Sequence, residues 1–146
     1  RGKALEAQTC IGFEGLPFTR FRFRTDVAEM DGPGGTRLRA TGVGRWLSKL
    51  RLDRLPELIN VLRGEMSLVG PRPHRAEFAA VLAHYYPYYG QRHVVKPGVL
   101  GWAQVNLGAP EKGWDARIEM EYDLYYIKAM SMRLDLYILL HSLLGR

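Results

Sequence analysis

The stretch that decides the fold is "LRLDRLPELINVLRGEMSLVGPRPHR", residues 50–75. Its leucine and isoleucine residues recur three or four positions apart, which predicts an amphipathic helix. Pro56 suits the first turn of that helix, and Asp53 just before it is a candidate N-cap. The glycine and two prolines that follow predict a rigid loop, which presents Arg72 in a fixed position.

The charged residues of this stretch fit either a structural or a chemical role. An aspartate N-cap is common and purely structural. A carboxylate at a helix N-terminus is also kept ionised by backbone N–H groups and the helix dipole, so Asp53 is available as a nucleophile or a metal ligand. Glu57 follows four residues later, near the same helix face. The rigid loop favours a binding role for Arg72, because a surface arginine rarely needs so fixed a backbone.

Upstream, residues 11–26 predict an antiparallel hairpin, whose second strand alternates apolar and basic residues. The alternation places Arg20, Arg22 and Arg24 on one face of that strand. Three guanidinium groups in a row suit phosphate oxygens. The strand alone favours the simpler interpretation, which is a solvated edge protected against aggregation by its charge.

The rest of the chain predicts an α+β fold that is mostly helical, with amphipathic helices and one small hairpin, in a single domain over residues 1–146. The residue pattern predicts a loop over residues 29–42 and a helix with an aromatic end over residues 74–93. It also predicts a turn with a strand over residues 94–106, and two helices over residues 111–130 and 131–146. The apolar side of the helix at 111–130 is expected to comprise Trp114, Ile118, Tyr122, Tyr125 and Ile127. The last helix, with Ser131 as its N-cap, is apolar nearly all round, which is typical of a buried helix, a membrane-surface helix or an oligomer contact.

Composition limits the functions without selecting one. The chain has 146 residues, of which 47% are hydrophobic, enough for one domain with a core. The net charge of +6 favours an anionic partner, which is a phosphate-bearing substrate, a membrane surface or a nucleic acid. A single cysteine excludes an internal disulfide, and the four histidines show no metal-ligand spacing. No signal peptide is visible, and no segment has the roughly 18 uninterrupted apolar residues of a membrane span.

Four blocks of the sequence, in order and spacing, resemble the bacterial sugar transferases, which are monotopic phosphoglycosyl transferases. The blocks are "PFTRFRFRT", "GRWLSKLRLDRLPELINVLRGEMSLVGPRP", "KPGVLGWAQVN" and "EYDLYYIKAMSMRLDLYILL". The last block looks most like members that serve exopolysaccharide systems. The resemblance implies transfer of a sugar 1-phosphate from a UDP-sugar to polyprenol (undecaprenyl) phosphate, with release of UMP. It also implies Mg²⁺, a covalent phosphosugar on an aspartate, and work at the cytoplasmic face of the bacterial inner membrane.

Carried over position by position, the resemblance assigns roles to several residues. Asp53 is then the catalytic nucleophile and a Mg²⁺ ligand, and Arg72 contacts the nucleotide phosphates. Arg22 replaces the lysine usual in the family, while Arg24 and Arg92 fall on family positions, so all four arginines are expected to bind substrate.

The chain departs from the family pattern beside the nucleophile. The pattern carries glutamate immediately after the aspartate and glutamine three residues further on, whereas this chain has Arg54 and Glu57. An arginine does not bind Mg²⁺ or accept a proton. Either Glu57 takes over as a catalytic residue, one turn from Asp53, or the chain is a weak or inactive member of the family.

The sequence also leaves two functional hypotheses open besides catalysis, a membrane-surface module and a nucleic-acid-binding domain. The N-terminal membrane helix of the family is absent from this sequence, so the chain is expected to be the globular catalytic part of a larger protein. It can instead be a non-catalytic membrane-surface or assembly module of the same fold. The charge alone also permits a nucleic-acid-binding domain, although the resemblance argues for no nucleic acid. The sequence leaves open a homo-oligomer and does not select the sugar.

Overall fold

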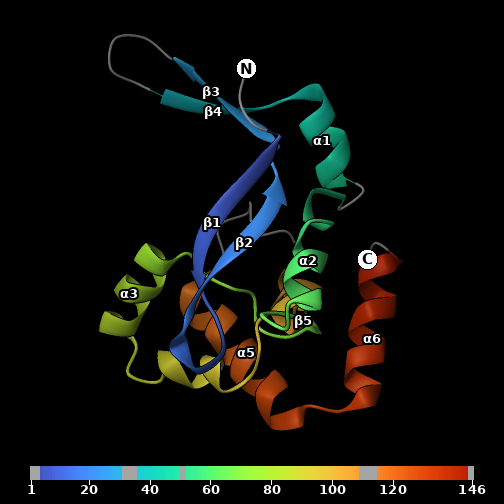
Figure 1. Ribbon diagram of the computed structural model, residues 1–146. Coiled ribbons are helices and arrows are strands. Elements are labelled where there is room, and N and C mark those ends of the chain that lie inside the picture. The colour runs from blue at the N-terminus through green and yellow to red at the C-terminus, as the bar shows by residue number, and fades with distance from the viewer. Residues whose placement is uncertain (1–3, 31–35, 50–51, 109–114, 145–146) are drawn as a thin grey trace.

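The computed structural model describes residues 4–30, 36–49, 52–108 and 115–144. It is an α+β arrangement in which helices surround a long hairpin (Figure 1). The strands are β1 (Leu5–Ile11), β2 (Pro17–Phe23), β3 (Asp26–Met30), β4 (Thr36–Ala40), β5 (Ser67–Val69) and β6 (Gly98–Leu100). The α-helices are α1 (Gly42–Lys49), α2 (Glu57–Leu62), α3 (Ala76–Tyr85), α4 (Trp102–Leu107), α5 (Ala116–Ala129) and α6 (Met132–Leu143). Three 3-10 turns complete the list: η1 (Phe13–Gly15), η2 (Leu52–Arg54) and η3 (Tyr89–Val94).

The predicted antiparallel hairpin is confirmed as the pair β1–β2, with Gln8 opposite Arg20 and Glu6 opposite Arg22. A second hairpin, β3–β4, continues from its upper end (Figure 1). The prediction of a loop over residues 29–42 is therefore wrong where these two strands lie, and residues 31–35 lie outside the described part of the chain. The glycines and prolines of this stretch favoured a loop and obscured the pattern of the strands on either side.

A single asparagine joins α2 to the edge of β2. Asn60 is fully buried, accepts a hydrogen bond from the backbone N–H of Phe21 at 3.2 Å, and donates one to the carbonyl of Thr19 at 2.7 Å. Because β2 has no strand partner on this side among the described residues, the amide continues its hydrogen-bond ladder. The side chains of η2 and α2 are thereby held against the arginines of β2.

The loop that carries Arg72 is fixed by a parallel pairing of β5 with β6. The N–H of Gly98 donates to the carbonyl of Pro71 at 2.9 Å, and the N–H of Gly70 donates to Leu100 at 2.9 Å. A Cβ atom on Gly98 would lie only 2.1 Å from the backbone nitrogen of Gly70, so no larger residue fits between the two backbones. The segment at 94–106, predicted as turn and strand, is β6 followed by α4.

The apolar core is divided into two small clusters. One joins Val69 of β5, Tyr126 of α5 and Ile138 of α6, and the other joins Ala79, Leu82 and Tyr89. Ser131 caps α6, as predicted, by accepting a hydrogen bond from the N–H of Leu134 at 3.2 Å.

The buried side of α5 differs from the prediction. It carries Glu119, Asp123 and Tyr126, whereas Ile118 and Tyr125 are exposed. Two buried carboxylates on this side mean that α5 serves a polar network as well as the core, which the apolar periodicity did not indicate. Trp114, the first residue predicted for its apolar side, lies outside the described residues.

Candidate functional site

Asp53 lies in the turn η2 and is 4% exposed. The prediction that it caps α2 is wrong, because the N-cap position is Pro56 and no side chain caps that helix. The Asp53 carboxylate instead forms an ion pair, through Oδ2, with the guanidinium of Arg22 on β2. Within the described residues no hydrogen bond reaches its other oxygen, Oδ1, which leaves that atom available for chemistry.

Glu57 forms a second ion pair one turn further on. It is fully buried, and its Oε1 accepts hydrogen bonds from Arg20 Nε at 2.9 Å and Arg20 Nη2 at 2.5 Å. Arg22 Nε lies 3.7 Å from the same oxygen. Arg20 is 3% exposed, so a solvated strand edge is the wrong interpretation for this residue. The three charged groups form one buried cluster beside Asp53.

Arg54 crosses from η2 to the opposite wall of the site. Its Nη1 donates to the carbonyl of Val99 at 3.2 Å and to Gln104 Oε1 at 3.1 Å. Burial lowers the pKa of Arg54, and the nearby cations Arg22 and Arg20 lower it further, against the opposing effect of Glu57. This side chain therefore adds positive charge to the space beside Asp53.

Arg72 approaches the same space from the loop after β5. Burial, together with the cations Arg54, Arg20 and Arg22, lowers its pKa to about 10, so it stays protonated at neutral pH. Within the described residues no hydrogen bond or ion pair engages its side chain. Four guanidinium groups thus surround two carboxylates, an excess of two positive charges. Such a cluster is suited to a dianion.

Arg92 lies behind the Arg72 loop. It is 3% exposed, and its Nη2 donates to the carbonyl of Arg72 at 2.6 Å and pairs with Asp123 Oδ2 at 2.7 Å. Its Nη1 contacts His74 Nδ1 at 2.5 Å, while His74 Nε2 lies 3.2 Å from Glu119 Oε1. The guanidinium is fully engaged in holding the loop that carries Arg72.

Sequence reasoning missed the residues of this network. His74 had been assigned no role beyond the absence of a metal-ligand spacing, and Glu119 and Asp123 were not singled out. Burial lowers the pKa of His74 and raises that of Asp123 to about 7, despite the lowering effect of Arg92. The available signal was the spacing of Glu119 and Asp123, four residues apart on one helix face.

Arg24 completes the predicted set. It follows the end of β2, is exposed, and donates its backbone N–H to the carbonyl of Ala4 at 2.8 Å. The structure thus brings Asp53, Glu57, Arg22 and Arg72 together, and places Arg92 behind them. The roles assigned to these residues stay predictions.

The residues around Asp53 do not fit a protein-bound Mg²⁺ ion. Mg²⁺ prefers carboxylate and water oxygens in an octahedral arrangement. Each carboxylate here already faces a guanidinium, and although Glu57 Oε2 has no hydrogen-bond partner in the described residues, it belongs to a fully buried side chain beside Arg20 and Arg22. No three histidine, cysteine or acidic residues gather as a metal site in the part of the chain that the structure describes. We therefore derive no step through Mg²⁺.

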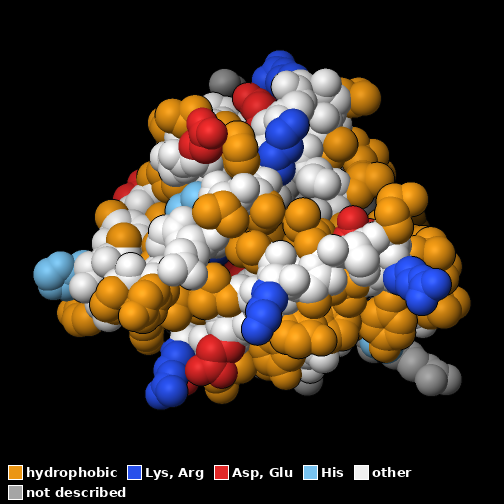
Figure 2. All heavy atoms as spheres, turned by 90° about the horizontal axis from the view of Figure 1, so that it is seen from below, with side chains coloured by type: hydrophobic (Ala, Val, Ile, Leu, Met, Phe, Trp, Pro, Cys, Tyr) orange, Lys and Arg blue, Asp and Glu red, His pale blue; other side chains and the backbone are white. Residues whose placement is uncertain are grey.

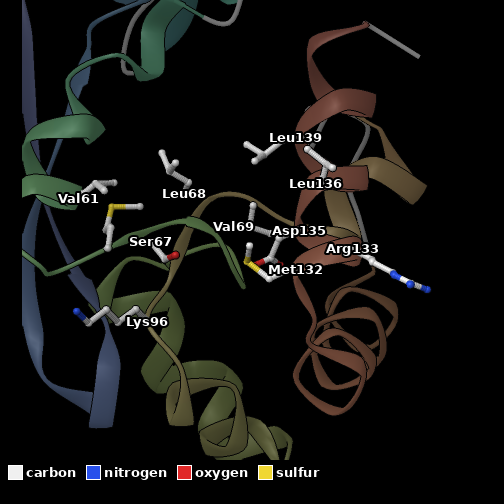
Figure 3. A pocket seen from close by; sticks show the side chains of 11 residues that line it. Val61, Ser67, Leu68, Val69, Lys96, Met132, Arg133, Asp135, Leu136 and Leu139 are labelled. Carbon is white, nitrogen blue, oxygen red and sulfur yellow. The ribbon is translucent and has the colours of Figure 1, made fainter.

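An apolar groove of about 640 Å³ lies between α2, β5 and α6. Leu68 of β5 and Leu139 of α6 lie on opposite sides of it, and the Arg133 side chain points outward from α6 (Figure 3). Lys96 contributes a cation to the lining. Searched over the described residues, none of the helices has the length and apolar character to cross a bilayer.

Fold and side-chain contacts together define a small α+β domain with a buried carboxylate in an arginine-rich cluster. The chain matches the family model described as bacterial sugar transferase over residues 1–145. It therefore belongs to the bacterial sugar transferase family, as its motifs indicated.

Three proteins with similar sequences illustrate the activities named among the relatives of this chain. An Aeromonas hydrophila protein, UDP-N-acetylgalactosamine-undecaprenyl-phosphate N-acetylgalactosaminephosphotransferase, is 37% identical over 97% of this chain and 35% of its own length. The uncharacterized sugar transferase EpsL of Bacillus subtilis strain 168 is 43% identical over 88% of this chain and 62% of its own. An undecaprenyl-phosphate glucose phosphotransferase of Komagataeibacter xylinus is 42% identical over 95% and 28% respectively. The chain spans less than two thirds of each of these proteins.

Proposed function

We propose that this chain is the catalytic part of an enzyme that transfers a sugar 1-phosphate from a UDP-sugar to polyprenol phosphate and releases UMP. The observation that carries the proposal is the buried Asp53 carboxylate near the guanidinium of Arg72. Among the residues that the structure describes, no hydrogen bond engages Asp53 Oδ1, and no hydrogen bond or ion pair engages the Arg72 side chain. The names of the relatives support this reaction class, since two of the three describe undecaprenyl-phosphate sugar phosphotransferases.

In the first half-reaction, Asp53 Oδ1 attacks the phosphorus that carries the sugar. A bond forms between that oxygen and the phosphorus, and the bond from this phosphorus to the bridging oxygen of the diphosphate breaks. The electron pair stays on the bridging oxygen, which leaves as part of UMP. Arg72 would bind the phosphate oxygens and stabilise the negative charge that develops on the departing UMP.

In the second half-reaction, an ionised oxygen of polyprenol phosphate attacks the same phosphorus. The bond between phosphorus and Asp53 breaks, and its electron pair restores the carboxylate. Both attacking oxygens are already ionised and both departing oxygens are stable anions, so neither half requires a proton transfer. This chemistry tolerates the absence of an acid at position 54, which supports activity in this chain.

We further propose that the enzyme works at the cytoplasmic face of the inner membrane, where polyprenol phosphate is held. The support is an exposed apolar stripe on α6. Its members share one helix face at intervals of three or four residues: Met132, Leu136, Leu140 and Leu143. Seen from below, apolar side chains cover much of the molecular surface, with scattered lysine and arginine residues among them (Figure 2). Such a mixed surface suits anionic headgroups above an apolar layer.

A UMP-release assay tests the proposal. The full-length protein is supplied with polyprenol phosphate and one UDP-sugar at a time. We expect repeated turnover to UMP with at least one sugar when polyprenol phosphate is present. Without polyprenol phosphate we expect at most about one UMP per protein molecule, because the first half-reaction alone releases it, and without protein we expect none. Absence of UMP with every sugar would contradict catalysis.

The second candidate is a non-catalytic module of the same fold, and one observation favours it: Arg54 replaces the acid of the family pattern. This candidate predicts that UDP-sugar stabilises the fold against heat while UMP never appears. The combination of ligand-induced stabilisation and turnover would exclude it.

A further inference from the structure

The residue that departs from the family pattern lies at the centre of the charge cluster. Arg54 follows Asp53 directly, where the pattern carries glutamate. The side chain is not left in solvent, because the Val99 carbonyl and Gln104 Oε1 both accept from its Nη1. Gln104 Oε1 also accepts from the N–H of Gly101 at 3.2 Å, which fixes the amide that receives Arg54. The structure therefore accommodates Arg54 in a defined position.

The two hydrogen bonds of Arg54 use only one of its three nitrogen atoms, so other N–H groups can bind a ligand. Both use Nη1, and within the described residues no hydrogen bond from Nε or Nη2 is formed. Arg54 lies close enough to Arg72 to lower the pKa of Arg72, and within the described residues none of the five N–H donors of Arg72 forms a hydrogen bond. Two guanidinium groups near Asp53 thus keep N–H donors that no hydrogen bond within the described residues uses.

The charges match the substrate class of the proposed function. Arg20 and Arg22 neutralise Glu57 and Asp53, and Arg54 and Arg72 remain. The diphosphate of a UDP-sugar carries two negative charges at neutral pH, equal to the charge of the two remaining cations. In phosphoryl transfer a metal ion stabilises the same charge on the phosphate oxygens. Arginine does so with planar, bidentate donors and needs no water or carboxylate ligands.

We propose that Arg54, together with Arg72, neutralises the diphosphate in place of Mg²⁺, so that this chain binds its nucleotide substrate without a divalent cation. The inference rests on the proposed function and goes beyond it, because it makes Arg54 a substrate-binding residue and not a lost acid. It also explains why Asp53 and Glu57 are both engaged by arginine. A metal ion would have to compete with Arg22 for Asp53 and would add charge to a cluster that is already cationic.

The test is UDP binding measured by titration calorimetry, in EDTA and again in excess Mg²⁺. We expect the wild-type dissociation constant to change less than about threefold between the two conditions. Arg54→Ala removes a charge-assisted contact and is expected to raise the constant in EDTA by about ten- to a hundredfold. Arg54→Glu restores the family pattern, and we expect UDP binding to become dependent on Mg²⁺, by about tenfold or more.

Arg117→Ala is the matched control, because Arg117 is an exposed arginine on α5 whose removal should leave the constant unchanged. Thermal unfolding without ligand checks that every variant is folded. Wild-type binding that appears only with Mg²⁺ would overturn the inference and leave the proposed function standing. Equal Mg²⁺ response in Arg54→Glu and wild type would also overturn it. Absence of UDP binding in both conditions would overturn the proposed function as well.

Discussion

At the scale of single residues, Glu57 is better explained as an ion-pair partner than as a replacement acid. Its buried Oε1 is held by Arg20, a residue that the strand pattern placed on a solvated edge. The Glu57 carboxylate is fully buried and is held by arginines. No contact within the described residues shows how it would reach a substrate. The hypothesis that Glu57 compensates for Arg54 stays a prediction, and it is testable by one substitution.

Glu57→Gln is expected to lower the free energy of unfolding by about 3 kcal/mol, because it leaves Arg20 buried without a counter-charge. Urea unfolding measures the change. The double variant Glu57→Gln/Arg20→Met should recover most of the loss, since it removes the uncompensated charge too. If the single variant costs under about 0.5 kcal/mol, the buried pair is no stronger than a surface pair. UMP release that persists in Glu57→Gln would remove the compensation hypothesis.

His74 provides a pH test of the network behind Arg72. Burial lowers its pKa in the folded state below the ordinary value of 6.5. The unfolded chain therefore takes up a proton before the folded chain does as pH falls, and the stability contributed by neutral His74 is lost below about pH 6.5. His93, whose pKa burial lowers to about 4, acts in the same direction.

Asp123, whose pKa burial raises to about 7, acts in the opposite direction over this range, because here the folded chain takes up the proton first. The contribution of His74 is therefore the difference between variants: from pH 7 to pH 5, His74→Gln is expected to lose less stability than the wild type, by at most about 1.4 kcal/mol per pH unit. His84→Gln, on the exposed side of α3, is the matched control. A slope that is equal in His74→Gln and wild type would show that His74 is not a neutral buried group. Urea midpoints at a series of pH values give the comparison.

At the scale of elements, sequence periodicity predicted the hairpin β1–β2, the helical segments and the cap of α6. It failed where polar groups are buried. The apolar side expected for α5 is exposed at Ile118 and Tyr125, because its inner face supports Arg92 and His74. Asp53 was expected to cap a helix, but the ion pair with Arg22 holds it in a turn. Such pairings join segments 31 or more residues apart, and no local pattern reveals them.

The candidate site could be predicted in part. Asp53 and Arg72 were chosen from one short stretch, and the structure brings their segments together through the β5–β6 pairing and the hairpin. Arg54 was seen as a departure, but its contacts with Val99 and Gln104 became visible only in three dimensions. The sequence could not show this, because the role of a guanidinium group depends on which of its N–H donors already form hydrogen bonds in the folded structure.

The exposed stripe of α6 makes a prediction about membrane contact. Leu136→Ser/Leu140→Ser should reduce binding to vesicles that contain anionic lipid at least threefold, because it removes apolar area that would enter the headgroup layer. Val81→Ser/Tyr85→Ser on α3 is a matched pair of exposed apolar substitutions at the same spacing. Co-sedimentation in low and high salt separates apolar insertion from charge attraction. Equal losses for both pairs would contradict a specific role for α6.

At the scale of the whole molecule, a basic domain with a net charge of +6 combines an arginine-rich site with an apolar surface. The long hairpin (Figure 1) and the glycine contact between β5 and β6 belong to two distant segments, and their arginines, Arg22 and Arg72, lie close to each other near Asp53. Charge is thereby concentrated where a diphosphate would bind, while α6 presents apolar side chains to its surroundings. This combination is what an enzyme needs to join a charged nucleotide sugar to a lipid phosphate.

The most direct test of the central claim is the effect of Asp53→Asn on UMP release, with the intermediate sought by mass spectrometry. We expect the full-length wild-type protein to release UMP and to gain the mass of one phosphosugar on Asp53 when UDP-sugar is supplied without acceptor. Asp53→Asn should fold, bind UDP, and show neither the product nor the added mass. UMP release by Asp53→Asn at the wild-type rate, or a phosphosugar on another residue, would contradict the assignment of Asp53 as the nucleophile.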